Sequence, residues 1–462
     1  MKKNLFYSIL VGFVGLFSVG CGDEYLAYPP SNSITLEEFI STPEDAQAVL
    51  NSAYKALSHK DALGGNTQFL GELMADNISA ARIQGDWLAH YTWTTDIFLG
   101  TTRNLMAQSF RVAGRANFLL DNMNLVTGLS EAEKTRMRGE ALFLRAIPHF
   151  ECVRFFGQPY GYTSGNTQSG IAIRTAWSKD LVNRSSVGEV YNQIIADLNE
   201  AITLLPESQD IYADKWAAKG YLAKVYFQMN DFQKAYDLAN DVINNGGFSM
   251  EADLMKRFNT SASSETIFET VSVSLGDESN NGFRDNFRPD PSTGLAAAYM
   301  SNDMFVAATA NPDDLRTQQW YVANTMGNIE CTKFPITTYT HVPIVHLTEM
   351  KLIRAEAAAE LGNTTTAFQD INDIRTRAGL GEVPAGTTTS DLITIIRNER
   401  RLELVGEGNR LHELKRQAVR NRPDLKIRGI APWDCNGMVC QIPDNELRGN
   451  PDMEPNPTGG CQ

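Results

Sequence analysis

Apolar residues recur at helical spacing through most of the chain. The clearest case lies within residues 187–205, where five apolar side chains fall on one helix face: Tyr191, Ile194, Leu198, Ala201 and Leu205. Ser186 and Glu189 precede this face with the spacing of a capping box, and Pro206 follows it as a stop signal. The pattern predicts an amphipathic helix with a marked start and a marked end.

Similar start signals occur earlier in the chain. Thr42 is followed by Pro43 and two acids, which is typical of an N-cap, a first helical position and a first turn. Ser130 and Glu133 repeat the capping-box spacing. These signals predict a series of helical hairpins.

Two segments superpose when one is shifted along the chain. Residues 223–243 (AKVYFQMNDFQKAYDLANDVI) and 355–375 (AEAAAELGNTTTAFQDINDIR) share small or apolar residues at matching places, such as Ala223 with Ala355 and Ala235 with Ala367. Each resembles a tetratricopeptide unit, a helix pair joined by a short turn. The two copies are not contiguous, so we expect the chain between them to form another surface.

The helical pattern breaks down into turns between about 248 and 341. One alternating stretch there, TIFETVSVS (266–274), predicts a strand. Long irregular spans of this kind are usually functional. We therefore predict an all-α fold of about four tetratricopeptide-like helical hairpins, with long irregular insertions that carry minor strands. The expected segments are 1–20, 21–246, an irregular insertion at 247–341, and 342–462.

The first segment has the layout of a secretory signal. Lys2 and Lys3 precede an apolar run from Leu5 to Val19, which is shorter than the roughly 20 residues of a spanning helix. Cys21 after small residues resembles a bacterial lipobox, and the two acids that follow resemble the surface-export signal of Bacteroidetes lipoproteins. The resemblance implies removal of residues 1–20 and lipidation of Cys21. An ordinary secreted protein is the alternative.

Charge and cysteine content narrow the function classes. The full chain carries a net charge of −14, and removing Lys2 and Lys3 leaves 39 basic and 55 acidic side chains, or −16. Such a surface repels phosphate backbones, which argues against nucleic acid as a partner. Cys435 and Cys440 bracket an Asn-Gly turn signal and could close a small disulfide loop, or stay free. A zinc site would need two further ligands nearby, so the sequence predicts no metal and no cofactor.

Six segments in order resemble the signatures of the SusD/RagB family and cover nearly the whole chain after residue 20. They are 138–160 (RGEALFLRAIPHFECVRFFGQPY), the helical pair at 211–246, 346–363, 371–380, 395–417 and 442–451 (IPDNELRGNP). The resemblance implies a cell-surface lipoprotein of the outer membrane that captures oligosaccharides, or in some members peptides. It also implies a partner, a SusC-like TonB-dependent transporter over which the lipoprotein closes as a lid.

The chain departs from the family pattern at two places. Pro148 stands where an aromatic residue is usual, and proline inside a helix removes a hydrogen bond and clashes with the carbonyl of Leu144. We expect a kink there. Glu413 replaces the commoner Asp and keeps the charge.

The charged segment 399–410 (ERRLELVGEGNR) could suggest catalysis. Its Arg400 and Glu403, and its Glu407 and Arg410, stand three apart, which is the spacing of ion pairs along a helix. This favours a structural network over acid–base chemistry. The chain also lacks the HExxH, GxSxG and GxGxxG motifs, so no enzyme is predicted. Residues 277–288 begin like a calcium loop but have Arg288 in place of the bidentate Glu, which favours a polar turn.

Saccharide binding points to aromatic residues in loops, because sugar rings stack on aromatic rings while their hydroxyls meet polar groups. Two clusters qualify, and the family resemblance implies that these regions form the ligand face. The first contains Trp87, Tyr91 and Trp93. The second contains Phe283, Arg284, Phe287, Arg288, Tyr299, Trp320 and Tyr321. Asp76 and Asn77 are expected to support the same face, and core packing is the alternative role for each ring.

These observations predict a surface lipoprotein that captures a nutrient and delivers it to a transporter. Two other classes stay open. A surface adhesin or assembly protein would bind host protein, and a glycan hydrolase would require a cleft with paired carboxylates.

Overall fold

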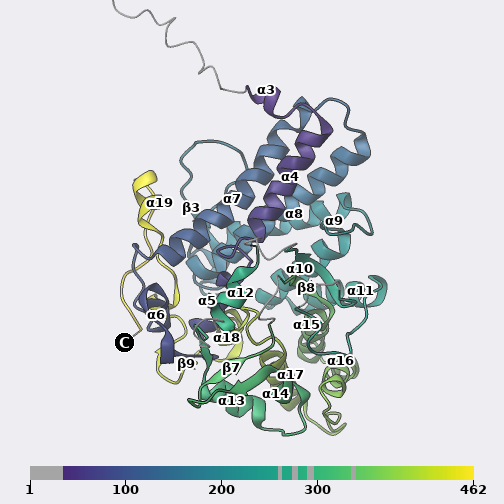
Figure 1. Cartoon of the computed structure of the whole chain (residues 1–462), viewed down its shortest axis with the longest axis vertical. Helices are drawn as coiled ribbons and strands as arrows, with labels where there is room; N and C mark the ends of the chain where they lie inside the picture. The colour runs from purple at the N-terminus through teal and green to yellow at the C-terminus, as the bar shows by residue number, and fades with distance from the viewer. Residues whose placement is uncertain (1–34, 259–262, 273–278, 289–295, 335–339, 462) are drawn as a thin grey trace, which may run out of the picture.

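The computed structural model describes residues 35–258, 263–272, 279–288, 296–334 and 340–461 (Figure 1), so the predicted signal peptide and Cys21 lie outside the described residues.

The helix starts predicted from the capping signals are confirmed. Thr42, Ser130 and Ser186 each form a reciprocal capping box. They open helices α4 (Pro43–Leu57), α8 (Glu131–Phe156) and α9 (Val187–Leu204).

The long helices stack side by side in one row. In order along the row they are α4, α7 (Gly100–Asn122), α8, α9, α10 (Lys215–Gln228), α11 (Phe232–Asn245), α15 (Leu347–Glu360), α16 (Thr364–Arg377) and α17 (Thr389–Glu403). The short helix α3 (Leu36–Phe39) lies at one end of the molecule and α17 near the other (Figure 1). The predicted all-α fold is confirmed.

The two superposable segments are two helix pairs that touch. The first pair is α10–α11, the second is α15–α16, and α11 packs directly on α15. The small side chains Ala223, Ala235, Ala355 and Ala367 are buried in these pairs, where helix axes must approach closely. The insertion therefore leaves the helical row after α11 and the row resumes at α15.

The insertions form a second layer of short elements beside the row. Its helices are α5 (Asn66–Leu73), α6 (Gly85–Tyr91), α12 (Asn281–Phe287), α13 (Asn302–Thr309), α14 (Leu315–Trp320), α18 (Arg410–Asn421) and α19 (Asp444–Gly449). Four 3-10 turns are η1 (Ala80–Arg82), η2 (Met123–Leu125), η3 (Ser164–Asn166) and η4 (Asn436–Met438). In Figure 1, α6 and α19 lie on the left, and α11 lies on the right.

Short strands connect distant parts of the chain. A four-stranded sheet has the order β1 (Ile78–Ser79), β5 (Tyr299–Met300), β7 (Ile329–Cys331) and β6 (Tyr321–Ala323). The predicted strand is confirmed over β4 (Thr266–Thr270), which is antiparallel to β8 (Val342–His346). Two further antiparallel pairs are β2 (Ser169–Ala172) with β3 (Arg184–Ser186), and β9 (Lys426–Ile427) with β10 (Ala431–Pro432).

Pro148 lies inside α8, which is one continuous helix from Glu131 to Phe156. The proline therefore does not end the helix, although it cannot donate the hydrogen bond that the Leu144 carbonyl would accept. The residue is buried among the core side chains of α8. Packing on α7 and α9 explains why the helix continues.

Of the two alternatives left open for Cys435 and Cys440, the small disulfide loop between them is not formed. Cys435 is bonded to Cys461, and Cys440 is a buried free thiol. Cys440 points into the core, where burial raises the pKa of its thiol to about 12. The C-terminal segment returns to Cys435 because Asn436 donates to the Thr458 carbonyl at 2.9 Å.

Residues 277–288, for which the sequence favoured a polar turn, are helical over part of their length. Residues 281–287 form helix α12, and Gly282 packs against the backbone of Gly64 and Asn66. Asp277 lies outside the described residues. Nowhere in the part of the chain that the structure describes do His, Cys, Asp and Glu form a group that could hold a metal ion. Within the same ranges, no helix combines the length and apolar character that a membrane span requires.

Candidate ligand-binding face

The fold brings the two predicted aromatic regions together. Strand β1 lies beside β5, so Ser79 is opposite Tyr299. The ring of Trp87 on α6 packs edge-on against Phe69 with centroids 4.9 Å apart, and Phe69 packs against Phe287 on α12 at 5.5 Å. Regions about 200 residues apart in sequence therefore share one aromatic cluster.

Most of the predicted rings are buried and do not lie on the surface. Six of them are at most 6% exposed: Trp93, Phe283, Phe287, Tyr299, Trp320 and Tyr321. The expectation that they form an exposed stacking surface is wrong for these six. All of them except Tyr299 belong to the main hydrophobic core, to which large rings contribute much buried area.

Four side chains of the two predicted clusters remain partly exposed. Trp87 and Tyr91 are half-buried on α6, and Arg284 on α12 forms an exposed ion pair with Asp285 at 2.8 Å. Arg288, which directly follows α12, is also half-buried. Among the predicted rings, Trp87 and Tyr91 thus keep surface that a ligand could reach.

Tyr91 is stacked against a residue that the sequence did not suggest. The guanidinium carbon of Arg428 lies 3.8 Å from the centroid of the Tyr91 ring and 3.7 Å from that of Trp93. Arg428 also donates a hydrogen bond to the Tyr91 carbonyl. Burial lowers the pKa of the Arg428 guanidinium below its usual value. We call Leu88, Tyr91, Arg428 and Ile430 the α6 face.

The α6 face joins a helix to the β9–β10 hairpin. Leu88 and Tyr91 stand three apart on α6, and both Leu88 and Ile430 are exposed apolar side chains. Arg428 occupies the hairpin turn with a positive φ of 51°. This arrangement presents apolar surface and a cation–π pair together, which suits an amphipathic ligand such as a sugar ring.

Asp76 and Asn77 lie underneath and hold this region to the C-terminal helices. Arg410 on α18 donates to both Asp76 carboxylate oxygens, at 2.6 and 2.8 Å, and Arg401 donates to the Asn77 amide oxygen at 2.9 Å. Although burial favours the neutral acid, the Arg410 pair lowers the pKa of Asp76 below its usual value. Both residues therefore fix β1 in place, and Asn77 is buried.

Sequence reasoning missed several surface residues that carry a usable signal. Phe98 is an exposed ring just beyond the first predicted cluster, and Trp177 is an exposed ring in another loop. Both meet the criterion of an aromatic residue outside a helix. Arg428 and Ile430 had no such signal, because a short hairpin brings Arg428 to Tyr91 only in the folded chain, with Ile430 exposed two residues further on.

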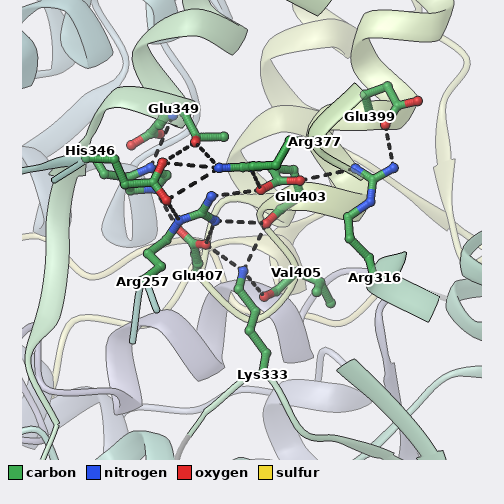
Figure 2. Close-up of polar contacts among 12 residues, drawn as sticks. Arg257, Arg316, Lys333, His346, Glu349, Arg377, Glu399, Glu403, Val405 and Glu407 are labelled. Atoms are coloured by element: carbon green, nitrogen blue, oxygen red, sulfur yellow. Dashed lines mark hydrogen bonds and ion pairs between the residues drawn. The ribbon is translucent and has the colours of Figure 1, made fainter. Parts of the chain in front are cut away.

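The charged segment 399–410 forms a buried ion-pair network, as predicted, but with different partners. Figure 2 shows Glu403 at its centre, bonded to Arg257, Arg316 and Arg377. Arg400 instead contacts Glu349 and Glu413. The predicted Arg400–Glu403 pair and the Glu407–Arg410 pair are therefore wrong, because each side chain meets charges from other elements.

Glu407 is the second anion of the network. It accepts hydrogen bonds from Lys333 at 2.5 Å, from Arg257 at 3.0 Å and from His346 at 2.9 Å (Figure 2). Burial opposes ionisation of Glu403 and Glu407, but the surrounding cations lower the pKa of both carboxyls well below the usual range. Carboxylates held ionised in this way are poor proton donors, and the network ties the insertion to α15 and α17.

Comparisons with known proteins show which family shares this architecture. A family model described as starch-binding associating with outer membrane matches residues 24–227, and the SusD family model matches residues 244–458. SusD-like protein P2 of Formosa agariphila is 26% identical, over 99% of this chain and 100% of that protein. A SusD-like protein of Bacteroides ovatus is 30% identical over 60% of this chain and 51% of its own length.

Solved structures show the same fold. A SusD superfamily protein from Bacteroides thetaiotaomicron aligns with a TM-score of 0.79 and 25% identity, covering 90% of this chain and all of that one. A laminarin binding SusD-like protein aligns with a TM-score of 0.73 and 20% identity, over 91% of this chain and 100% of that one. Since two matching models follow one another along almost the whole described chain and the helical row has the same architecture, the chain belongs to the SusD/RagB family.

Proposed function

We propose that this protein is a lipid-anchored lipoprotein of the bacterial cell surface that captures an oligosaccharide and delivers it to a TonB-dependent outer-membrane transporter. Family membership supports binding as its role. The single observation that carries the site is the stack of Arg428 on Tyr91 at 3.8 Å, next to exposed apolar side chains. A peptide is the alternative nutrient.

The α6 face offers the two kinds of contact that a sugar needs. The exposed parts of Tyr91 and Leu88 would pack against the apolar face of a pyranose. The partly exposed guanidinium of Arg428 would donate to ring or glycosidic oxygens, and its packing on two rings keeps it oriented before the ligand arrives. Asp76 and Asn77 would act only by holding β1 beneath this face.

Replacing Tyr91 by alanine is expected to weaken glycan binding about fivefold to tenfold, because a stacked ring contributes about 1 kcal/mol beyond its buried area. Calorimetric titration of the purified protein with starch and laminarin oligosaccharides, and with a peptide mixture, measures the change. Arg428→Ala is expected to weaken binding of the same glycan.

Tyr236→Ala is the matched control, because Tyr236 is a half-buried ring on α11, on the opposite side of the molecule from α6 (Figure 1). Melting curves of all three variants separate a binding defect from unfolding. Unchanged glycan affinity in a folded Tyr91→Ala and a folded Arg428→Ala would move the site away from the α6 face. Binding of peptides alone would replace the oligosaccharide with a peptide as cargo.

Cys21→Ala is expected to move the protein from the membrane fraction to the soluble fraction, because acyl chains on that cysteine would anchor the protein in the bilayer. Fractionation in cells that lack the transporter measures this. In cells that have it, wild-type protein is expected to co-purify with a larger outer-membrane protein in mild detergent. Membrane retention of the variant without the transporter, or repeated recovery of the wild type alone, would contradict this part of the proposal.

A further inference from the structure

A cleft of about 240 Å³ shares no lining residue with the α6 face. It opens between α7, the β2–β3 strand pair and the chain around α19. Its floor is apolar and buried, formed by Met106, Ile171, Ile442 and Met453. Trp177, in the loop between β2 and β3, stands at its mouth. A volume slightly below that of pockets for drug-sized ligands has room for about one ring.

Trp177 is held in place by its surroundings, while its ring stays accessible to solvent. Its side chain is 55% exposed, and its ring packs edge-on against Phe118 at 4.8 Å. Its backbone N–H donates to the Asp121 carboxylate at 2.6 Å, and Asn117 donates to the Arg174 and Ala176 carbonyls beside it. The loop is thus tied to α7 from both sides, so the ring needs little ordering before a ligand stacks on it.

Asn117 is a buried polar residue of the lining whose amide is already hydrogen-bonded, whereas Arg174, Arg184 and Glu446 are partly exposed. The Arg184 guanidinium lines the cleft but already donates to backbone carbonyls, including those of Gly170 at 2.8 Å and Phe156 at 3.0 Å. Arg174 uses one terminal nitrogen on the Asp180 carbonyl at 2.9 Å, and its other terminal nitrogen has no protein partner among the described residues. Glu446 on α19 supplies a partly exposed carboxylate.

We propose that this cleft is a second saccharide site, and that it prefers a pyranose carrying a methyl group, as in a 6-deoxyhexose or an N-acetylhexosamine. The apolar face of the ring stacks on Trp177, and ring hydroxyls meet Arg174 and Glu446 at the rim. The methyl group enters the apolar floor. A hydroxymethyl group in its place would bury an unpaired hydroxyl there, and binding would weaken.

The choice of a saccharide rests on the proposed function, whereas the cleft and its apolar floor do not. Gly114 on α7 gives a direct test, because it lines the cleft and a Cβ built there meets nothing within 4 Å. A phenyl group at this position would start from open space beside the cleft and take up part of it. Gly114→Ala adds only a methyl group and favours the helix, so it is the matched control.

The experiment is saturation-transfer NMR of the whole protein with fucose, N-acetylglucosamine and glucose. The two methyl-bearing sugars are expected to bind at least fivefold more tightly than glucose. Gly114→Phe and Trp177→Ala are each expected to weaken the binding of the two methyl-bearing sugars at least fivefold. Gly114→Ala is expected to weaken it less than twofold. Trp177 is on the surface, so Trp177→Ala keeps the test valid if Gly114→Phe fails to fold.

The outcomes separate this site from the α6 face. Loss of methyl-sugar binding in folded Trp177→Ala, with the glycan affinity of the α6 face unchanged, supports the second site. Unchanged methyl-sugar binding in that variant, or equal binding of glucose, overturns it while the proposed function stands. If no saccharide binds the wild type at either place, both proposals fail. Displacement of a methyl sugar by an apolar dipeptide with higher affinity would make the cleft a peptide side-chain site and also overturn the inference.

Discussion

Replacing Glu403 by alanine is expected to lower the free energy of unfolding by about 3–5 kcal/mol, as happens when one partner of a buried ion pair is removed. Glu403 is completely buried and bonds Arg257 at 2.7 Å and Arg316 at 3.2 Å. Without its carboxylate, these guanidinium groups would stay buried with less compensation. Urea titration followed by circular dichroism measures the loss.

Glu131→Ala is the comparison for an ion pair in water. The Glu131 side chain is 88% exposed and bonds Lys134 at 2.9 Å, so its removal is expected to cost less than about 1 kcal/mol. Glu403→Gln, which keeps the shape and one acceptor, should fall between the two. A Glu403→Ala protein as stable as Glu131→Ala would mean that the network gives no net stabilisation that alanine removes.

The second large effect is expected at Gly408, in the turn between α17 and α18. Its φ of +82° is one that alanine adopts at a cost of about 1–2 kcal/mol, and a Cβ there would lie 2.5 Å from the Cα of Gln68 on α5. Overpacking of this kind costs about 1–3 kcal/mol more. Gly408→Ala should therefore lower the free energy of unfolding by about 2–5 kcal/mol in the same urea titration.

Gly362 separates the two causes. It has the same φ of +82°, but a Cβ there meets nothing within 4 Å. Gly362→Ala is expected to cost only the backbone strain, about 1–2 kcal/mol. If Gly408→Ala were no more destabilising than Gly362→Ala, the close approach of α5 to the turn would not limit the residue at position 408.

The two aromatic regions named from the sequence meet in the fold, and most of their rings are buried. Aromatic residues marked the two regions that meet around Phe69 and Phe287. Residue type does not say which ring points to solvent, because the same large apolar area favours both burial and stacking. Trp320 and Tyr91 look alike in the sequence, yet Trp320 is completely buried and Tyr91 carries Arg428 on its ring.

The sequence by itself determined the features that depend on neighbouring residues. Capping at Thr42, Ser130 and Ser186 needs side chains three positions away, and helical pairing at 223–243 and 355–375 needs a repeated apolar period, so both could be predicted from local pattern. The family resemblance likewise came from ordered local segments, and the matching family models confirm it.

Only the tertiary structure decided which distant groups meet. Cys435 is bonded to Cys461 and not to Cys440. Glu403 meets Arg257 and Arg316 from the insertion, and Arg428 in the β9–β10 hairpin reaches Tyr91 on α6. Each partner lies many residues away or on another element, and several cysteines and arginines of equal chemistry compete for each place. The choice depends on how the insertions pack on the helical row, because burial makes an unpaired charge or polar group costly and so selects one arrangement.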